Sequence, residues 1–548
     1  MATTISSFLH EDMISLRGNT LLAMFESYNL NTSTLLLYAV ITFITLGVLT
    51  WTLSCPGGPA WKRGRNCIGF VSIPSPKGLP IFGSLLSLAH GLPHRTLASM
   101  AQTSQAASQL MAISLGSTPT VVASDPQTGR EILTSQHFAN RPIKQSARLL
   151  MFNRAIGFAP NGTYWRLLRK VASSHLFAPR KISAHEPARS LECTSMLNDI
   201  SKEQSLHGFV VLRKHLQAAS LNNIMEIVFG KSYNKVGDVD ESMELQEMVR
   251  EGFELLGAFN WSDHLPWLNY FYDPFRIKQR CMALVPQVKK FIKKIINEHK
   301  LRGSVNLQDD SDFVDVLLSL DGQDNLSEDD MVAILWEMVF RGTDTIALLT
   351  EWVMAELTLN QGIQSKLRFE LDSFMGNKST NNDYADITKL PYLQAVIKET
   401  LRLHPPGPLL SWARLSTSDV HLSNGMVIPA NTTAMVNMWS ITHNSDVWDH
   451  PFTFEPDRFL ISAGGSNVDV RGYDLRLAPF GAGRRVCPGM NLGMVTVSEW
   501  VAKLVYQFEW IQDMRRPVDL TEELKLSCEM KQPLCAKVIP RNGASEMM

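Results

Sequence analysis

The chain has 548 residues, and its 52 Lys and Arg against 53 Asp and Glu give a formal net charge of −1. This balance argues against a nucleic-acid-binding protein, which should show a basic excess or stripe. Hydrophobic residues make up 45% of the chain and charged residues 19%, a mixture that supports a large core and excludes general disorder. The seven cysteines are odd in number and include no C-x-x-C pair, so we expect neither a disulfide scaffold nor a zinc ribbon.

The first predicted element is an apolar helix over residues 34–53, a run without a charged side chain. A helix of ~20 residues at ~1.5 Å each spans a ~30 Å hydrocarbon core. A buried core helix and a cleaved signal peptide are the alternatives, but the run has no polar stripe and follows a long, mainly acidic leader. Because Lys62, Arg63 and Arg65 come after it, the positive-inside rule places residues 1–33 in the lumen and the body in the cytosol. The sequence therefore predicts a single-pass transmembrane signal anchor.

Residues 54–80 form a basic, proline-rich segment that predicts a stiff hinge without helix or central strand. An ordinary linker is the alternative. Beyond this segment helical patterns dominate, for example at 285–300 and 327–359. A β-type segment at 419–429 contains Asn424-Gly425, which is typical of a two-residue hairpin turn. The predicted fold class is mainly α with a small β portion, in one domain over residues 81–548.

Cys487 is the residue with the most distinctive surroundings. It lies in a glycine-rich loop just before a helical pattern that begins near Met490. Backbone N–H groups and the positive end of a helix favour a thiolate, the form that ligates metals. Gly481, Gly483 and Gly489 would let the loop pass close to a flat ligand without Cβ clashes. A lone loop cysteine is more often inert, so the wider pattern has to decide.

Five residues match the pattern F-x-x-G-x-R-x-C-x-G: Phe480, Gly483, Arg485, Cys487 and Gly489. With this pattern the chain resembles cytochrome P-450, a family of heme-thiolate monooxygenases. The resemblance implies the P-450 fold behind the N-terminal transmembrane helix, with heme b as cofactor. It also implies that Cys487 is the axial ligand of the heme iron, where a thiolate donates electron density that favours O–O cleavage.

A second motif is Glu399-x-x-Arg402, on a helix pattern that is opened by Pro391 and stopped at His404. The spacing places both side chains on one helical face. By itself such a pair is commonly a solvated ion pair. The resemblance adds Arg458, from the segment FEPDRF, as the third member of a structural network that holds the heme loop.

A third motif is RGTDT at 341–345, within a run that predicts a buried helix. It resembles the oxygen-binding A/G-G-x-D/E-T motif of the family, which implies that Asp344 and Thr345 manage proton delivery. Arg341 stands where the family usually has Ala or Gly, and Ile346 where Thr or Ser is frequent. The proton route is therefore expected to differ from the family pattern.

Four residues are implied to hold the heme propionates, through bidentate pairing or close packing: Trp165, Arg169, Arg414 and Arg485. An exposed basic helix is the alternative for the first two. Phe480 and Gly489 complete the implied heme-binding set.

The resemblance covers nearly the whole chain and, at 412–448, extends to a plant A-type subfamily associated with organ and seed growth. It implies an endoplasmic-reticulum enzyme that inserts one atom of O₂ into an apolar small molecule. The sequence has no dinucleotide motif, so electrons from NADPH would come through a separate NADPH–cytochrome P-450 reductase. Five lysines are candidates to contact it, with simple solvation as the alternative: Lys170, Lys289, Lys290, Lys293 and Lys294.

Two other functions are weighed against this one. A P-450-type isomerase or dehydratase needs neither O₂ nor a reductase, and intact Asp344 and Thr345 argue against it. A heme-containing sensor would bind a gas or a lipid without turnover.

A fatty acid or related lipid is the favoured substrate and a terpenoid the second choice. The segments expected to line the pocket are largely apolar, which favours hydrocarbon burial: 143–158, 408–412, the oxygen helix and the turn near Pro533 and Leu534. Arg148 and Arg154 are candidates to pair a substrate carboxylate at the entrance, with solvation as the alternative.

Overall fold

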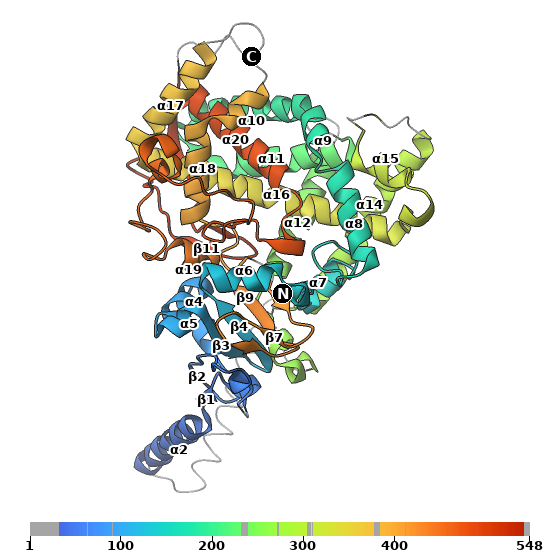
Figure 1. The fold of residues 1–548 in the computed structure, drawn as a ribbon. Helices are drawn as coiled ribbons and strands as arrows, with labels where there is room; N and C mark the ends of the chain where they lie inside the picture. Colours follow the sequence, from blue (N-terminus) through green and yellow to red (C-terminus); the bar gives the residue numbers. More distant parts are fainter. Residues whose placement is uncertain are drawn as a thin grey trace, which may run out of the picture.

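The computed structural model describes residues 32–541 except 63, 90, 232–238, 271, 272, 274, 304–307, 309, 310, 377–383, 411 and 412. Helices make up most of the described chain, and several of the short strands, including those of the largest sheet, lie at the end of the body nearest the N-terminal helix (Figure 1). The predicted class, mainly α with a small β portion, is confirmed.

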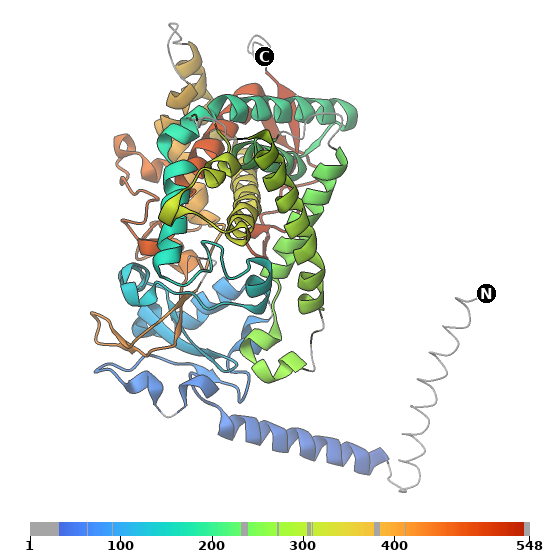
Figure 2. The same cartoon turned by 90° about the vertical axis from the view of Figure 1, so that its right-hand side faces the viewer.

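The N-terminal helix α2 (Thr32–Leu53) contains the apolar run predicted as an anchor. Its side chains are exposed wherever they are described, from Thr34 to Thr50 and at Leu53, and Figure 2 shows the helix extending away from the body. Among the described residues, no helix has the length and apolar character that crossing a membrane requires. Apart from Thr32 and Ser33, the predicted lumenal tail lies outside the described residues.

Residues 54–80, the predicted hinge, are packed onto the body. β1 (Cys55–Pro56) pairs antiparallel with β2 (Lys77–Gly78), and short 3₁₀ turns lie between them. Trp61 is 1% exposed and its indole N–H donates to the carbonyl of Ile113 at 2.7 Å. The segment is thus held against the body by the β1–β2 pair and by Trp61. Its described residues form no α-helix, as its prolines predict.

The helical part is built around α16 (Glu328–Leu359), which packs against α11 (Leu212–Phe229), α18 (Pro391–Leu403) and α20 (Met490–Gln507). Ser327 begins α16 with a capping box, in which its side chain and that of Asp330 exchange hydrogen bonds with each other's backbone N–H. The helices predicted over 327–359 and from Pro391 to His404 are both present.

The remaining described α-helices are, in chain order, α3 (Leu85–Leu88), α4 (Pro93–Ala101), α5 (Gln105–Gln109), α6 (Pro126–Thr134), α7 (Gln145–Leu150), α8 (Thr163–His175), α9 (Pro179–Ala184), α10 (Glu186–His207), α12 (Val239–Gly257), α13 (Trp261–His264), α14 (Ile277–Arg302), α15 (Phe313–Leu318), α17 (Gln361–Gly376) and α19 (Met438–Thr442).

The largest sheet has the strand order β3-β4-β9-β6, in which only the β4–β9 pair is parallel: β3 (Leu110–Leu115), β4 (Thr118–Ala123), β6 (Arg414–Leu415) and β9 (Thr433–Val436). A second sheet has the order β10-β13-β5: β5 (Val210–Val211), β10 (Phe508–Gln512) and β13 (Cys535–Pro540). β11 (Glu522–Leu524) and β12 (Cys528–Met530) form a separate antiparallel pair.

The hairpin predicted at 419–429 is formed by β7 (Val420–His421) and β8 (Val427–Ile428). The Leu422 N–H also donates to the carbonyl of Met426, so the turn has three residues where two were predicted. Gly425 supplies the positive φ of 81° within it.

The hydrophobic core is interrupted at one place along α16. Residues from Met331 to Phe340 belong to a cluster with α7, α8, α11 and α14, and residues from Ile346 onward belong to a second cluster with α18 and α20. The stretch 341–345, RGTDT, contributes to neither cluster. The helix therefore leaves an opening in the core at the third predicted motif.

Candidate active site

A cavity of about 300 Å³ lies at this opening. Its walls come from α16, α8 and the loop before it, the segment after α18, and the loop that holds Cys487. Eight of the predicted site residues line it: Trp165, Arg169, Thr345, Arg414, Phe480, Arg485, Cys487 and Gly489. The fold thus brings together residues that are up to about three hundred positions apart in the chain.

The Cys487 loop is folded back on itself by backbone hydrogen bonds. The N–H of Cys487 donates to the carbonyl of Phe480 at 3.0 Å, and the N–H of Val486 to that of Gly483 at 3.1 Å. The exposed surface of the Cys487 side chain faces the cavity, and protein surrounds the sulfur on its other sides. The structure therefore presents this sulfur to whatever occupies the cavity.

Burial raises the pKa of the Cys487 thiol, although the N–H of Gly489 and the guanidinium groups of Arg341 and Arg169 lower it. The prediction that the helix end makes the thiolate the favoured form is thus not met by the protein alone, because the effect of burial outweighs that of the loop N–H and the nearby guanidinium groups. A metal cation bound to the sulfur would supply the missing stabilisation of the thiolate.

The three loop glycines have different roles. Gly481, at φ 73°, and Gly489 line the cavity, and a Cβ on Gly481 would meet nothing within 4 Å. A Cβ on Gly483, at φ 68°, would lie 2.2 Å from the carbonyl oxygen of Leu133. Room for a flat ligand therefore accounts for Gly481 alone, since a Cβ on Gly489 would lie 3.3 Å from Cε1 of Phe177. Gly483 is needed for the close approach of α6.

Two cavity arginines are locked in place by the backbone. Arg485 donates to the carbonyls of Ala139, Ile156 and Ala159 at 2.6–2.9 Å, and its guanidinium lies 4.3 Å from the ring centre of Trp165. Arg169 donates to the carbonyl of Val486 at 2.9 Å. A guanidinium carries five N–H donors, so both residues keep donors for a ligand.

Arg414 is 4% exposed, and its Nε and Nη1 have no hydrogen-bond partner among the described residues. Burial lowers its pKa to about 10. Burial, together with the charges of Arg414 and Arg169, lowers the pKa of Arg485 to about 9. Buried guanidinium groups with unused N–H donors favour an anionic ligand. The two propionate carboxylates of heme b can accept these hydrogen bonds. The cavity therefore fits heme b, with Cys487 at the iron and the arginines at the propionates.

On the α16 wall, Thr345 and Gly342 face the cavity. The Thr345 hydroxyl lies 3.5 Å from the carbonyl of Arg341, at the limit of a hydrogen bond, so the hydroxyl is available to other partners. A Cβ on Gly342 would lie 2.6 Å from Cδ1 of Ile224, so this glycine makes room for α11.

Asp344 lies apart from its neighbour Thr345, since it is not among the cavity-lining residues. Burial and the charge of Glu529 raise the pKa of Asp344 to about 7, against a hydrogen bond with Gln217 and the charges of Arg213 and Lys525. The carboxyl is thus directed to α11 and to the β11–β12 hairpin. The sequence placed Asp344 and Thr345 together, and the structure places them on different sides of the helix.

The second motif forms a compact ion-pair network. Arg402 makes two hydrogen bonds of 2.8 Å to Glu399, and Arg458 makes a third at 3.1 Å. Arg402 also donates to the carbonyls of Thr442 and Pro451, at 2.8 and 2.7 Å. Glu399 and Arg402 are 0% exposed. The network ties α18 to the segment that follows α19.

The structure corrects several predicted pocket walls. The C-terminal wall is formed by Leu526 and Ser527, whereas Leu534 is buried in the core and its N–H donates to Glu351 at 2.8 Å. Arg148 and Arg154 do not line the cavity, and Arg154 is paired with Asp330. From the segment 143–158 only Ile156 and Gly157 line it, and Leu410 is the lining residue of 408–412, of which 411 and 412 lie outside the described residues.

The sequence reasoning missed Arg141 and Glu337, which also line the cavity. Glu337 lies four residues before Arg341, a spacing that places the two on one helical face. That spacing is a signal the sequence offers. Arg141 has no comparable local signal.

Four of the five candidate lysines for reductase contact are already paired with acids: Lys170 with Asp324, Lys289 with Asp329, Lys293 with Glu328 and Lys294 with Glu241. Their charges are largely compensated, so these lysines do not make a strongly basic docking surface.

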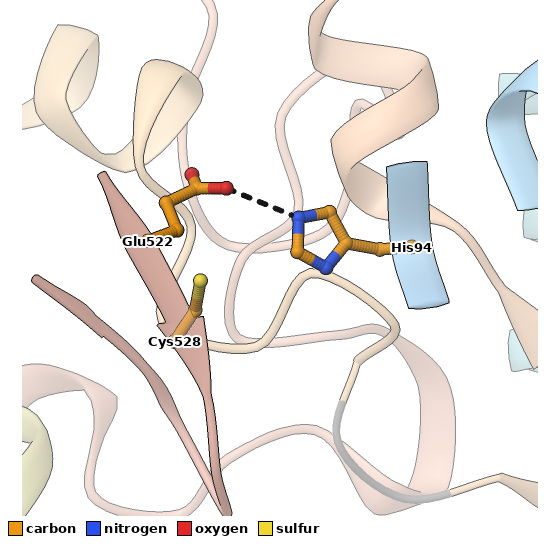
Figure 3. Close-up of side chains that lie close together, drawn as sticks. All are labelled: His94, Glu522 and Cys528. Carbon is orange, nitrogen blue, oxygen red and sulfur yellow. Dashed lines mark hydrogen bonds and ion pairs between the residues drawn. The ribbon is translucent and has the colours of Figure 1, made fainter. Parts of the chain in front are cut away.

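Outside the cavity, His94, Glu522 and Cys528 form a buried group of metal-ligand type (Figure 3). His94 Nε2 lies 3.3 Å from Glu522, and Arg95 lies 2.8 Å from the same carboxylate. Burial would raise the pKa of Glu522, but the hydrogen bond from His94 and the charge of Arg95 outweigh it and lower that pKa. The carboxylate is therefore satisfied by protein groups, and the cluster joins α4 to the β11–β12 hairpin.

Comparison with known proteins shows which family this chain belongs to. The family model for cytochrome P450 matches residues 73–535. The chain belongs to the cytochrome P450 family. It is 62% identical to cytochrome P450 78A7 of Arabidopsis thaliana over 94% of this chain and 96% of that protein. It is 58% identical to cytochrome P450 78A11 of Oryza sativa subsp. japonica, over 92% of each. Cytochrome P450 98A2 of Glycine max is more distant, at 33% identity over 92% of this chain and 97% of that protein.

These findings confirm the resemblance to a plant P450 subfamily, here the 78A group. The chain is accordingly a P450 monooxygenase, an oxidoreductase that uses heme b with O₂ and electrons derived from NADPH. The donor set described above, one cysteine and several arginines around one cavity, is consistent with that cofactor.

Proposed function

We propose that this P450 hydroxylates an apolar small molecule, with a fatty acid or related lipid favoured and a terpenoid second. The observation that carries the proposal is the cavity at the break in the core, where Cys487 and Thr345 share one space with apolar side chains such as Ile224, Phe253 and Leu349. Hydrocarbon buried against such walls gains roughly 25 cal/mol per Å².

Heme b ligated by a thiolate supplies the reductive activation of O₂ when it is bound. The protein contributes the surroundings. Cys487 binds the iron, while Arg169, Arg414 and Arg485 bind the propionates and so orient the cofactor. Thr345 holds a hydroxyl proton at the cavity surface, and the apolar walls exclude water from the reaction. Asp344 lies outside the cavity lining, where burial raises its pKa, and no step of proton delivery is assigned to it.

The electron donor in this proposal is a separate NADPH–cytochrome P450 reductase. The sequence has no dinucleotide-binding motif of its own, so electrons must come from a partner. Because four of the five predicted lysines are paired with acids, the docking surface is not assigned to them.

We further propose that the apolar run in α2 anchors the protein in the endoplasmic-reticulum membrane, with the catalytic domain in the cytosol, although no described helix by itself has the length and apolar character of a span. The helix carries no charged side chain, its described side chains are exposed, and Lys62 and Arg65 follow it. Deletion of residues 1–55 should move the protein from the membrane fraction toward the soluble fraction with its heme retained. Loss of heme binding on this deletion would contradict the anchor.

Reconstitution with a plant reductase and NADPH tests the function. Fatty acids of medium and long chain should shift the ferric heme spectrum and yield hydroxylated products in proportion to NADPH consumed. If a polycyclic terpenoid does both and fatty acids do neither, the lipid assignment is wrong. Products formed without NADPH would instead indicate an isomerase or dehydratase, and tight binding without products a sensor.

A further inference from the structure

The α16 wall of the cavity has a notch where Gly342 contributes no side chain. Gly342 lines the cavity, and Thr345, three residues further along the same helix, lines it too. Residues three apart lie on one face of a helix, so the notch and the Thr345 hydroxyl are neighbours on the same stretch of wall. Whatever fills the notch therefore determines the width of the cavity beside Thr345.

The notch is filled by Ile224, which comes from α11. A Cβ on Gly342 would lie 2.6 Å from Cδ1 and 2.7 Å from Cγ1 of Ile224, so the end of the isoleucine occupies the space that a side chain at position 342 would need. Ile224 also lines the cavity, although it is only 3% exposed and belongs to the core cluster around α16. Its side chain is thus both a core residue and a part of the cavity wall.

The position of Ile224 is fixed by the way α11 is attached to α16. Ser220, one turn earlier on α11, is 1% exposed, and its hydroxyl donates to the carbonyl of Thr343 at 2.6 Å. The same hydroxyl oxygen lies 3.3 Å from the carbonyl of Gly342. Ile224 is β-branched, so its χ1 angle is restricted on a helix. A ligand that needed the notch would therefore have to displace a packed side chain.

We propose that Ile224 is a specificity-determining residue, which restricts the cavity beside Thr345 to slim, unbranched hydrocarbon. This inference rests on the proposed function and favours a linear chain over a fused-ring skeleton at the site of oxidation. One carbon more or less in an apolar pocket changes the discrimination between ligands by about 10–200-fold. Because the side chain is uncharged, its effect is independent of the arginines assigned to the propionates.

The test uses two heme ligands that do not depend on the natural substrate. N-Hexylimidazole carries a slim chain and N-adamantylimidazole a wide cage, and both bind ferric iron through an imidazole nitrogen. In spectral titrations of the full-length enzyme, wild type should prefer the hexyl compound. Ile224→Ala removes three carbon atoms at the notch and should strengthen binding of the adamantyl compound about tenfold or more relative to the hexyl compound. Ile224→Val removes only Cδ1 and should change the preference in the same direction by a smaller factor.

Ile227 provides the matched control. It lies on the same helix, is also 3% exposed and belongs to the same core cluster, but it is not among the described residues that line the cavity. Ile227→Ala should lower the thermal midpoint as Ile224→Ala does, and it should leave the ratio of the two imidazole affinities unchanged. An equal ratio in wild type, Ile224→Ala and Ile227→Ala would show that Ile224 is only a core residue, and the proposal would be overturned.

Refilling the notch from α16 gives an independent check. Gly342→Ala alone would press its Cβ against Ile224 and should lower the thermal midpoint. In the Ile224→Ala background the nearest remaining atom of residue 224 is Cβ, at 3.5 Å, so the same substitution should be tolerated. The double variant should also return the imidazole preference toward that of wild type. A double variant that accepts the adamantyl compound as well as Ile224→Ala does would contradict the proposal.

Titration and turnover with dodecanoic acid distinguish this inference from the proposed lipid substrate. A predicted change in the imidazole ratio, with no response of any variant to dodecanoic acid, supports Ile224 and contradicts the lipid assignment. Hydroxylation of dodecanoic acid by wild type, with an imidazole ratio that Ile224→Ala leaves unchanged, supports the lipid assignment and contradicts Ile224.

Discussion

Two groups of buried arginine in this P450 differ in how they are satisfied. Arg402, on α18, is 0% exposed and makes hydrogen bonds to Glu399 and to the carbonyls of Thr442, Pro451 and Thr453. Arg414, in the cavity wall, is 4% exposed, and two of its nitrogens have no hydrogen-bond partner among the described residues. Burial is nearly equal, but only the first guanidinium has a complete set of partners within the protein.

The difference shows which buried charges build the fold and which await a ligand. A buried ion pair with complete hydrogen bonding holds its own segments together, and removing one partner leaves an uncompensated charge. A buried arginine with unused N–H donors destabilises the folded protein until an anion binds to it. Charge removal should therefore damage the protein itself in the α18 network and damage cofactor or substrate binding in the cavity.

The largest effect is expected for Arg402→Ala. Glu399 would stay buried with a much weakened set of partners, which costs about 3–5 kcal/mol of unfolding free energy. Arg414→Met should have little effect on that free energy and should instead speed the loss of heme to an acceptor protein. Thermal or urea unfolding of both variants checks the contrast. Equal destabilisation by the two substitutions would refute the distinction.

Asp344 is a third buried charged group, and its raised pKa makes the stability of the protein depend on pH. Its pKa is raised from the ordinary 3.8 to about 7, mainly by burial, so the folded protein holds this proton more tightly than the unfolded chain does. The contribution of Asp344 to stability is therefore full below about pH 4 and is lost as the pH rises to about 7. Asp344→Asn should remove this slope and make the variant more stable than wild type at pH 8, by at most about 4 kcal/mol. Unfolding measured across this range would contradict the account if the slope were unchanged.

Two glycines of the Cys487 loop, Gly481 and Gly483, differ in how much room a side chain would have. Gly483→Ala should destabilise the loop by about 1–3 kcal/mol in addition to backbone strain, because its Cβ would clash with the carbonyl of Leu133. Gly481→Ala should cost only the left-handed strain, about 1–2 kcal/mol, since its Cβ meets no atom of the protein. Heme content and thermal midpoint measure both. A Gly481→Ala protein that retains its fold but loses heme would show instead that the ligand needs this space.

The smallest structural effect is expected at Thr345, where the consequence is chemical. Thr345→Ala should leave heme ligation and stability nearly unchanged and should raise hydrogen peroxide formed per NADPH severalfold, because a cavity hydroxyl is lost. Thr345→Ser keeps the hydroxyl and should retain coupling. If Ala and Ser couple equally well, the proton route does not use this side chain.

The sequence predicted those parts of the molecule that depend on local pattern. Proline at the start of α18, the helical run that begins at Ser327 and the glycine-rich loop before α20 are visible in the chain, and each element begins where its pattern indicates. The resemblance to the family implied that Cys487 and three arginines bind heme, and the structure brings these residues to one cavity.

The remainder depends on packing between distant segments. Asp344 and Thr345 are adjacent in sequence, but the approach of α11 and the β11–β12 hairpin determines that only Thr345 reaches the cavity. The wall formed by Leu526 and Ser527 likewise depends on where that hairpin folds back. Arg341 was visible as a departure from the family motif, but its ion pair with Glu337 and its place in the cavity wall emerge only from the assembled structure.

The central claim is that Cys487 presents a thiolate to heme iron, and the reduced carbon monoxide spectrum tests it most directly. Thiolate ligation donates electron density to the iron and shifts the Soret band of the carbon monoxide complex to the position after which the family is named. Wild-type protein should show this band, and Cys487→Ser should lose it while the cavity arginines still retain heme. A Cys487→Ser protein that keeps the band and its turnover would contradict the assignment of the axial ligand.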